Sequence, residues 1–93
     1  MRRVLRWVIP ADDKWHRIDA PKESIVHVAT RAEPCAEVWT MPYAEVWTMD
    51  DGQPGESWLR VFGTGHEITE GAYIGTAVTP SGRLVWHVFA KEA

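Results

Sequence analysis

The sequence predicts an all-β domain, mostly antiparallel, built as a small β-sandwich or a partly open barrel of about six to eight short strands. Short runs rich in Val, Ile, Trp and Thr alternate with Pro, Gly and Asp at intervals of about 8 to 14 residues. No window holds a helical stripe of three turns. The 93 residues suffice for one hydrophobic core, so residues 1–93 are expected to form a single domain.

The N-terminal third contains three expected strands, at residues 4–9, 15–18 and 24–30. Pro10 and the acidic turn behind it end the first strand, because proline cannot donate to a sheet ladder. Period-two alternation places three apolar side chains of this strand on one face: Leu5, Trp7 and Ile9. In the strand at 24–30 the same alternation places Ile25, His27 and Ala29 on one face, and Val26 and Val28 on the other.

A tandem eight-residue repeat occupies the middle of the chain, at residues 36–51. Residues 36–41 and 44–49 both have the sequence Ala-Glu-Val-Trp-Thr-Met. An even offset keeps each residue type on the same sheet face, because strand side chains alternate with period two. Either copy could therefore form one particular strand with nearly the same contacts, as expected after a recent tandem duplication.

Three arrangements of the two copies are compatible with the sequence. The copies could pair as a hairpin around Pro42 and Tyr43, one copy could form a loop, or one could pair with another molecule. The Asp50-Asp51-Gly52 segment is a better turn than Pro42-Tyr43. We therefore expect the hairpin after Met49 and treat the second copy as the more regular strand.

The C-terminal third contains strands at residues 57–63, 73–79 and 84–90. The last two are joined by Pro80-Ser81-Gly82-Arg83, which is a strong hairpin signal. The final strand is apolar on both faces, with Leu84, Trp86 and Val88 on one and Val85, His87 and Phe89 on the other. This pattern predicts a position in the interior of the sheet.

Charge and cysteine usage exclude several classes of protein. A net charge of −3 gives no global attraction to nucleic acid or to an anionic membrane. The basic cluster formed by Arg2, Arg3 and Arg6 is expected to be a solvated strand edge. No apolar stretch is long enough to span a bilayer. Cys35 is the only cysteine, which excludes an intramolecular disulfide and favours the cytoplasm.

The six tryptophans are the compositional outlier, because a core of this size cannot enclose them all. Some indoles are therefore expected near the surface, at an oligomer interface or a ligand platform. Trp39 and Trp47, which are equivalent in the two repeat copies, are the candidate partner-binding tryptophans.

A glycine-rich loop is expected after residue 63, and it supplies candidate ligand-binding residues: Gly63, Thr64, Gly65 and His66. Such a loop can present backbone amides to a phosphate, although this one lacks the lysine and the helix of a P-loop. The simpler interpretation is that glycine permits a positive φ at a strand end.

No catalytic residue, metal ligand or cofactor is predicted. The four histidines lie singly on different segments, without the paired spacings of zinc sites. His66 beside Glu67 is a weak acid–base candidate, since adjacent side chains often point apart, and Cys35 has no evident base. The sequence therefore favours a protein that is not an enzyme.

Three segments carry a family resemblance: Val-Phe-Gly-Thr-Gly-His-Glu at 61–67, Tyr-Ile-Gly-Thr at 73–76 and Leu-Val-Trp-His-Val-Phe at 84–89. In this order they resemble a family of short uncharacterised proteins of tailed phages, including phages of actinobacteria. The family has a single copy where this chain has two. The resemblance implies a phage origin and carries over no catalytic residue.

These observations predict a non-enzymatic phage accessory protein in the cytoplasm of the bacterial host. It would act by binding a host or phage protein, by forming a homo-oligomer, or both. The alternative is a protein that binds or sequesters a small molecule such as a nucleotide, through the loop at 63–66 and a surface tryptophan.

Overall fold

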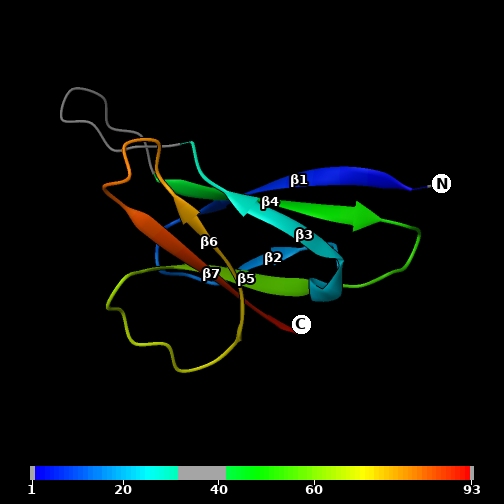
Figure 1. The fold of residues 1–93 in the computed structure, drawn as a ribbon. Coiled ribbons are helices and arrows are strands. Elements are labelled where there is room, and N and C mark those ends of the chain that lie inside the picture. Colours follow the sequence, from blue (N-terminus) through cyan, green and yellow to red (C-terminus); the bar gives the residue numbers. More distant parts are fainter. Residues whose placement is uncertain (1, 32–41, 93) are drawn as a thin grey trace.

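The computed structural model describes residues 2–31 and 42–92, which form a sandwich of two antiparallel sheets (Figure 1). The three-stranded sheet has the strand order β1-β4-β3, and the four-stranded sheet has the order β2-β5-β7-β6. The sheets do not close into a barrel. The all-β prediction is confirmed, and of its two forms the structure adopts the sandwich.

Each expected strand outside the first repeat copy is found close to its predicted position. The strands are β1 (Arg3–Pro10), β2 (His16–Ile18), β3 (Ile25–Ala29), β4 (Tyr43–Asp50), β5 (Ser57–Gly63), β6 (Ala72–Val78) and β7 (Val85–Glu92). A single 3-10 turn, η1 (Lys22–Ser24), precedes β3. In the described residues no helix is long and apolar enough to cross a membrane.

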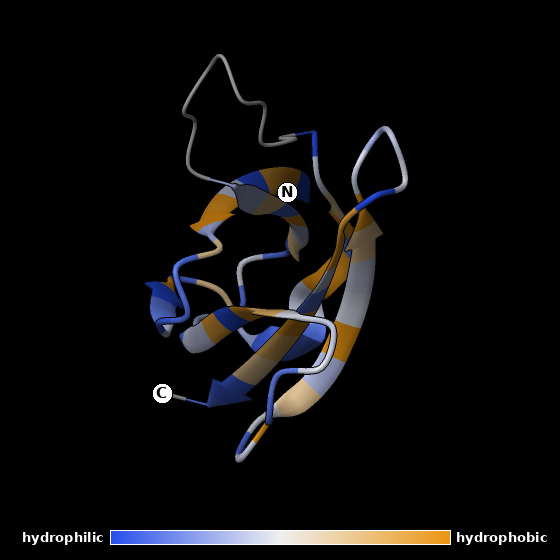
Figure 2. Cartoon of the chain, turned by 90° about the vertical axis from the view of Figure 1, so that its left-hand side faces the viewer, coloured by the Kyte–Doolittle hydropathy of each residue, from blue (hydrophilic) through white to orange (hydrophobic). Residues whose placement is uncertain are grey.

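The core lies between the two sheets and follows from the alternation of the strands, which Figure 2 shows as bands of hydrophobic and hydrophilic residues. Its centre is formed by fully buried apolar side chains, among them Ile9, Val46, Leu59, Val61 and Val88. Leu5, Trp7 and Ile9 share the inner face of β1 as predicted, with exposed residues between them. The indole Nε1 of Trp7 donates a hydrogen bond to Thr48 Oγ1 at 2.9 Å, which satisfies both polar groups beside the core.

The C-terminal hairpin and the interior position of its second strand are confirmed. The Thr79 amide donates to the Leu84 carbonyl oxygen at 3.0 Å across the turn, and β7 pairs with β5 on one side and with β6 on the other. Val88 and Ala90 are buried in the core. Phe89 on the opposite face packs against Phe62 at a ring-centroid distance of 5.5 Å, so both faces of β7 are covered, as its composition predicts.

The predicted faces of the third strand are wrong because β3 contains a β-bulge between Ile25 and His27. One extra residue on the bulged strand reverses the alternation. Ile25 and Val28 therefore both pack against the core, while Val26 and His27 are both exposed. Sequence alternation contains no sign of this extra residue.

The predicted hairpin after Met49 is also wrong. β4 and β5 belong to different sheets, and residues 51–56 carry the chain from one sheet to the other. Asp50, Asp51 and Gly52 do form a turn, since the Gly52 amide donates to Asp50 Oδ1 at 3.1 Å and Gly52 has a φ of +91°. This turn changes sheet instead of reversing the strand.

The second repeat copy forms β4, and the first copy, at residues 36–41, lies outside the described residues. β4 pairs with β1 along one edge and with β3 along the other, which leaves no edge where the two copies could form a hairpin with each other. That arrangement is therefore wrong.

Asp50 distinguishes the two copies, because the equivalent position after the first copy is Pro42. Its carboxylate pairs with Arg3 Nε at 3.0 Å. The Gly52 amide and the Arg3 guanidinium together lower the pKa of Asp50 from its ordinary value of 3.8. Only the second copy is followed by a residue that can make these contacts.

Deleting residues 36–43 should leave a folded protein. Cys35 would then precede Ala44, and the carbonyls of Pro34 and Cys35 could replace those of Pro42 and Tyr43, which accept from the Ala11 amide and the Thr30 hydroxyl. Shortening a loop changes its closure free energy only slowly, so the melting temperature should stay within about 5 °C of the parent value. Thermal unfolding followed by circular dichroism measures this.

Deleting residues 44–51 provides the matched control. The remaining copy has the same six residues, but Asp50 and its contacts with Arg3 and Gly52 are lost. This variant should fold and melt at a lower temperature than the first. An unfolded 36–43 deletion would show instead that both copies are integral to the structure.

Candidate binding surfaces

The outer face of the three-stranded sheet is defined here by the outward side chains of its strands: Val4, Arg6, Val8, Val26, His27, Ala29, Glu45, Trp47 and Met49. The strand register arranges most of them in cross-strand rows. Val4 lies opposite Met49, and Val26 lines the same surface hollow as Met49. Trp47 lies between Arg6 and His27, and Glu45 lies between Val8 and Ala29.

This face is unusually apolar for a sheet surface that meets water. Val4, Val8 and Val26 are 55%, 51% and 57% exposed. In an antiparallel sheet with one solvated face, the side chains on that face are ordinarily polar. Here six of the nine outward residues are Val, Met, Ala or Trp. Because contiguous exposed apolar surface can mark an interaction site, this face is a candidate binding surface.

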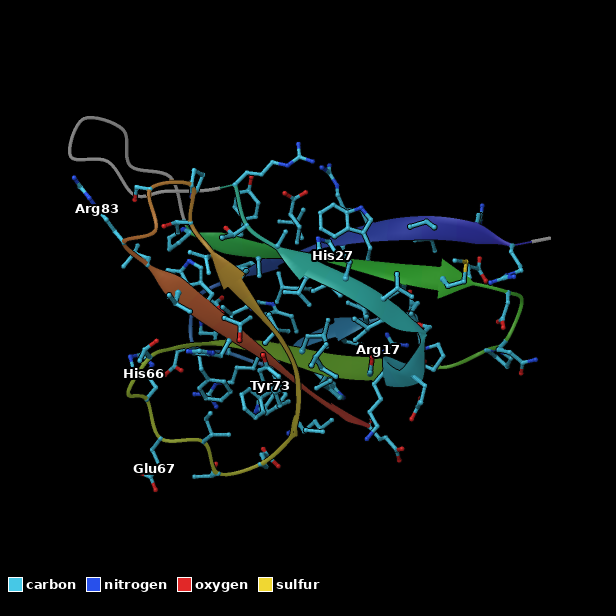
Figure 3. The ribbon with its side chains drawn as sticks, in the orientation of Figure 1. Arg17, His27, His66, Glu67, Tyr73 and Arg83 are labelled. Carbon is cyan, nitrogen blue, oxygen red and sulfur yellow. The ribbon has the colours of Figure 1, made fainter. Side chains whose placement is uncertain are left out.

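Trp47 occupies the middle of the outer face. It is half-buried and packs against His27, with a ring-centroid distance of 5.3 Å and an interplanar angle of 49° (Figure 3 labels His27). All of the tryptophans that the structure describes are half-buried: Trp7, Trp15, Trp47, Trp58 and Trp86. Trp39, the other candidate tryptophan, lies outside the described residues.

Glu45 is a buried charge that sequence reasoning missed. Its side chain is 1% exposed, although it projects from the outer face. Arg6 Nη1 donates to Oε2 at 2.9 Å, and Arg31 Nε lies 3.0 Å from Oε1 as an ion pair without hydrogen-bond alignment. The two guanidinium groups compensate the cost of burying the carboxylate.

Removing the two arginines should therefore destabilise the fold more than removing the carboxylate charge. The double variant Arg6→Gln, Arg31→Gln leaves a buried charge without a cation and should lose about 3 kcal/mol of unfolding free energy. Glu45→Gln leaves two arginines that are more than half exposed, and it should lose about 1 kcal/mol. Urea denaturation measures both values, and a larger loss for Glu45→Gln would contradict the assigned burial.

The glycine-rich loop lies at the end of the other sheet. The His66 amide donates to the Gly63 carbonyl oxygen at 3.3 Å, and Gly65 has a φ of +91°, which explains the glycine at this position. The loop borders a surface hollow of about 470 Å³, whose lining is Ala11, Gly63, Thr64, His66, Arg83, Leu84, Val85 and Trp86. Trp47 does not line this hollow, so the structure does not bring the candidate tryptophan to the loop.

A network of hydrogen bonds between hydroxyl and imidazole groups connects the loop to the four-stranded sheet. Thr64 Oγ1 lies 3.0 Å from Nε2 of His87, and Nδ1 of the same ring lies 3.2 Å from Thr76 Oγ1. The Tyr73 hydroxyl extends the network to Thr76 at 2.6 Å. These contacts hold the start of the loop against β6 and β7.

The weak acid–base pair of the sequence is not a pair in the structure. His66 and Glu67 lie apart on the loop in Figure 3, and no ion pair joins them within residues 2–31 and 42–92. The histidine–carboxylate pair that does form joins His16 Nε2 to Asp12 Oδ1 at 2.7 Å, and this hydrogen bond lowers the pKa of Asp12. In the same part of the chain no group of three His, Cys, Asp or Glu side chains could hold a metal ion.

Among the residues of the hollow that sequence reasoning missed, Arg83 and Trp86 are the two that carry polar side-chain groups. Both lie on the C-terminal hairpin, about twenty residues from the glycine-rich loop. The strand order could have indicated their position, because β7 pairs with β5 and this places Trp86 opposite Gly63.

The fold and these two surfaces define a small β-sandwich protein with candidate binding sites on both sheets. The whole chain, residues 1–93, matches a domain of unknown function, DUF7352, and the protein belongs to that family. No curated protein and no solved structure matches the chain. The resemblance to an uncharacterised family is thus supported, while its phage origin stays a prediction.

Proposed function

We propose that the protein is a non-enzymatic phage accessory protein that acts by binding in the cytoplasm of the bacterial host, and that its partner is a second copy of itself. The observation that supports this proposal is the apolar outer face of the three-stranded sheet. Val4, Val26 and Met49 form an apolar region at one end of the face, and Trp47 lies beside it.

A second copy suits this face for two reasons. Two such faces related by a two-fold axis would pack as aligned sheets about 10 Å apart, with valine and tryptophan side chains between them. The carboxylate on the face, Glu45, is already paired with Arg6 and Arg31 within the same copy. Association would therefore bring no unpaired carboxylate into the interface.

The phage origin and the absence of catalysis have separate support. The phage origin is supported by the resemblance of the segments at 61–67, 73–76 and 84–89 to short tailed-phage proteins. The non-enzymatic assignment is supported by the separation of His66 from Glu67.

Val26→Lys should convert the dimer to a monomer. Lysine at this exposed position would place an unpaired charge in the interface and raise the dissociation constant by at least about tenfold. Val78→Lys is the matched control, because Val78 is 54% exposed on β6 of the other sheet. Native mass spectrometry and light scattering should give twice 10.6 kDa for the parent and for Val78→Lys.

The possible results separate the parts of the proposal. If the parent protein is monomeric at about 100 µM, the dissociation constant of any dimer lies above that concentration, and this result would refute self-association. Equal weakening by both lysine variants would refute the assignment to the outer face. A complex with a host protein that only Val26→Lys abolishes would replace the second copy by that partner.

A further inference from the structure

The hollow beside the glycine-rich loop has the chemistry of an anion site. The titratable side chains that line it are those of Arg83 and His66, and no carboxylate lines it. This is notable in a chain with 13 acidic and 10 basic residues. Figure 3 shows His66 on the loop and Arg83 on the hairpin turn at the same end of the sandwich, with the Arg83 side chain extending away from His66.

Arg83 is available for an external anion. Five of the described arginines form ion pairs with carboxylates: Arg3, Arg6, Arg17, Arg31 and Arg60. Arg83 forms none with the residues that the structure describes. Its local turn contact uses the backbone amide, which donates to Ser81 Oγ at 3.2 Å, and leaves the guanidinium out. A guanidinium without a partner is well suited to phosphoryl oxygens.

Trp86 supplies the second, independent observation. Its ring packs against the core and lines the hollow, and its Nε1 is buried without an acceptor among the described residues. Because the Nε1 atom itself is closed to solvent, a ligand in the hollow would meet the ring of Trp86 and would change the environment of its N–H group without contacting that group.

The loop has open space beside Gly65, where an added Cβ atom would meet no atom within 4 Å. The turn is held in place by the contact between Thr64 and His87. Glycine-rich turns can present backbone amides to an anion, although the His66 amide here already donates to the Gly63 carbonyl oxygen.

We propose that this hollow binds the phosphoryl group of a small molecule. His66 lies beside the loop, and the exposed Arg83 side chain would turn toward it so that both contact the phosphoryl oxygens. The rest of the ligand would lie against Trp86 and Leu84. The volume of about 470 Å³ is in the range of small-molecule sites and would admit a mononucleotide. This inference goes beyond the proposed function and does not depend on self-association.

The Trp86 indole N–H resonance tests this assignment directly. It can be identified by its absence in Trp86→Phe, which keeps an aromatic ring in the core. Inorganic phosphate and adenosine 5′-monophosphate should shift this resonance at constant ionic strength, with a dissociation constant of about 1 mM or tighter, and adenosine should not. Tighter binding of the nucleotide would support an organic phosphate, and equal affinities would support free phosphate.

Arg83→Gln should weaken binding of the nucleotide by at least about tenfold, because a charge-assisted hydrogen bond is lost. Arg83 is exposed in a turn, so the fold should be unaffected. Arg2→Gln is the matched control, since Arg2 has no ion pair in the described part of the chain and lines a different hollow. An unshifted Trp86 resonance, equal shifts with adenosine, or equal weakening by both variants would overturn the proposal.

Discussion

The structure depends most on the pairing of β4 along both of its edges. β1 and β3 hydrogen-bond with β4 and not with each other, so the three-stranded sheet exists only through this strand. The same strand buries Ala44 and Val46 in the core, and its Thr48 hydroxyl accepts the indole N–H of Trp7. A central strand with one buried face has little freedom to shift its register, because a one-residue slip would expose its apolar set.

The outer side of β4 creates the surface on which the proposed function rests. Since Ala44 and Val46 face the core, alternation directs Glu45 and Trp47 outward. Two arginines from neighbouring segments then neutralise the carboxylate, and His27 packs on the indole. The apolar character of the face comes from valines of β1 and β3 together with Trp47 and Met49 of β4, so all three strands of the sheet form this surface.

The hollow at the other sheet has a different origin. β7 lies between β5 and β6, and this order brings the C-terminal hairpin next to the glycine-rich loop. Thr64, His87 and Thr76 hold the loop in that position. The two surfaces therefore use separate strands, and substitutions such as Val26→Lys and Arg83→Gln can probe them independently.

Local pattern by itself determined the all-β class, the position of nearly every described strand, the inner face of β1 and the interior place of β7. These features depend on period-two burial and on turn residues, which are properties of short segments. The glycine-rich loop was also recognised as a site candidate, but its neighbours Arg83 and Trp86 were not.

Only tertiary structure decided the bulge at Val26, the crossing of residues 51–56 between sheets, the burial of Glu45 and the separation of Trp47 from the loop. Each of these depends on which strands become neighbours, and contacts between distant segments leave no periodic signal in the sequence.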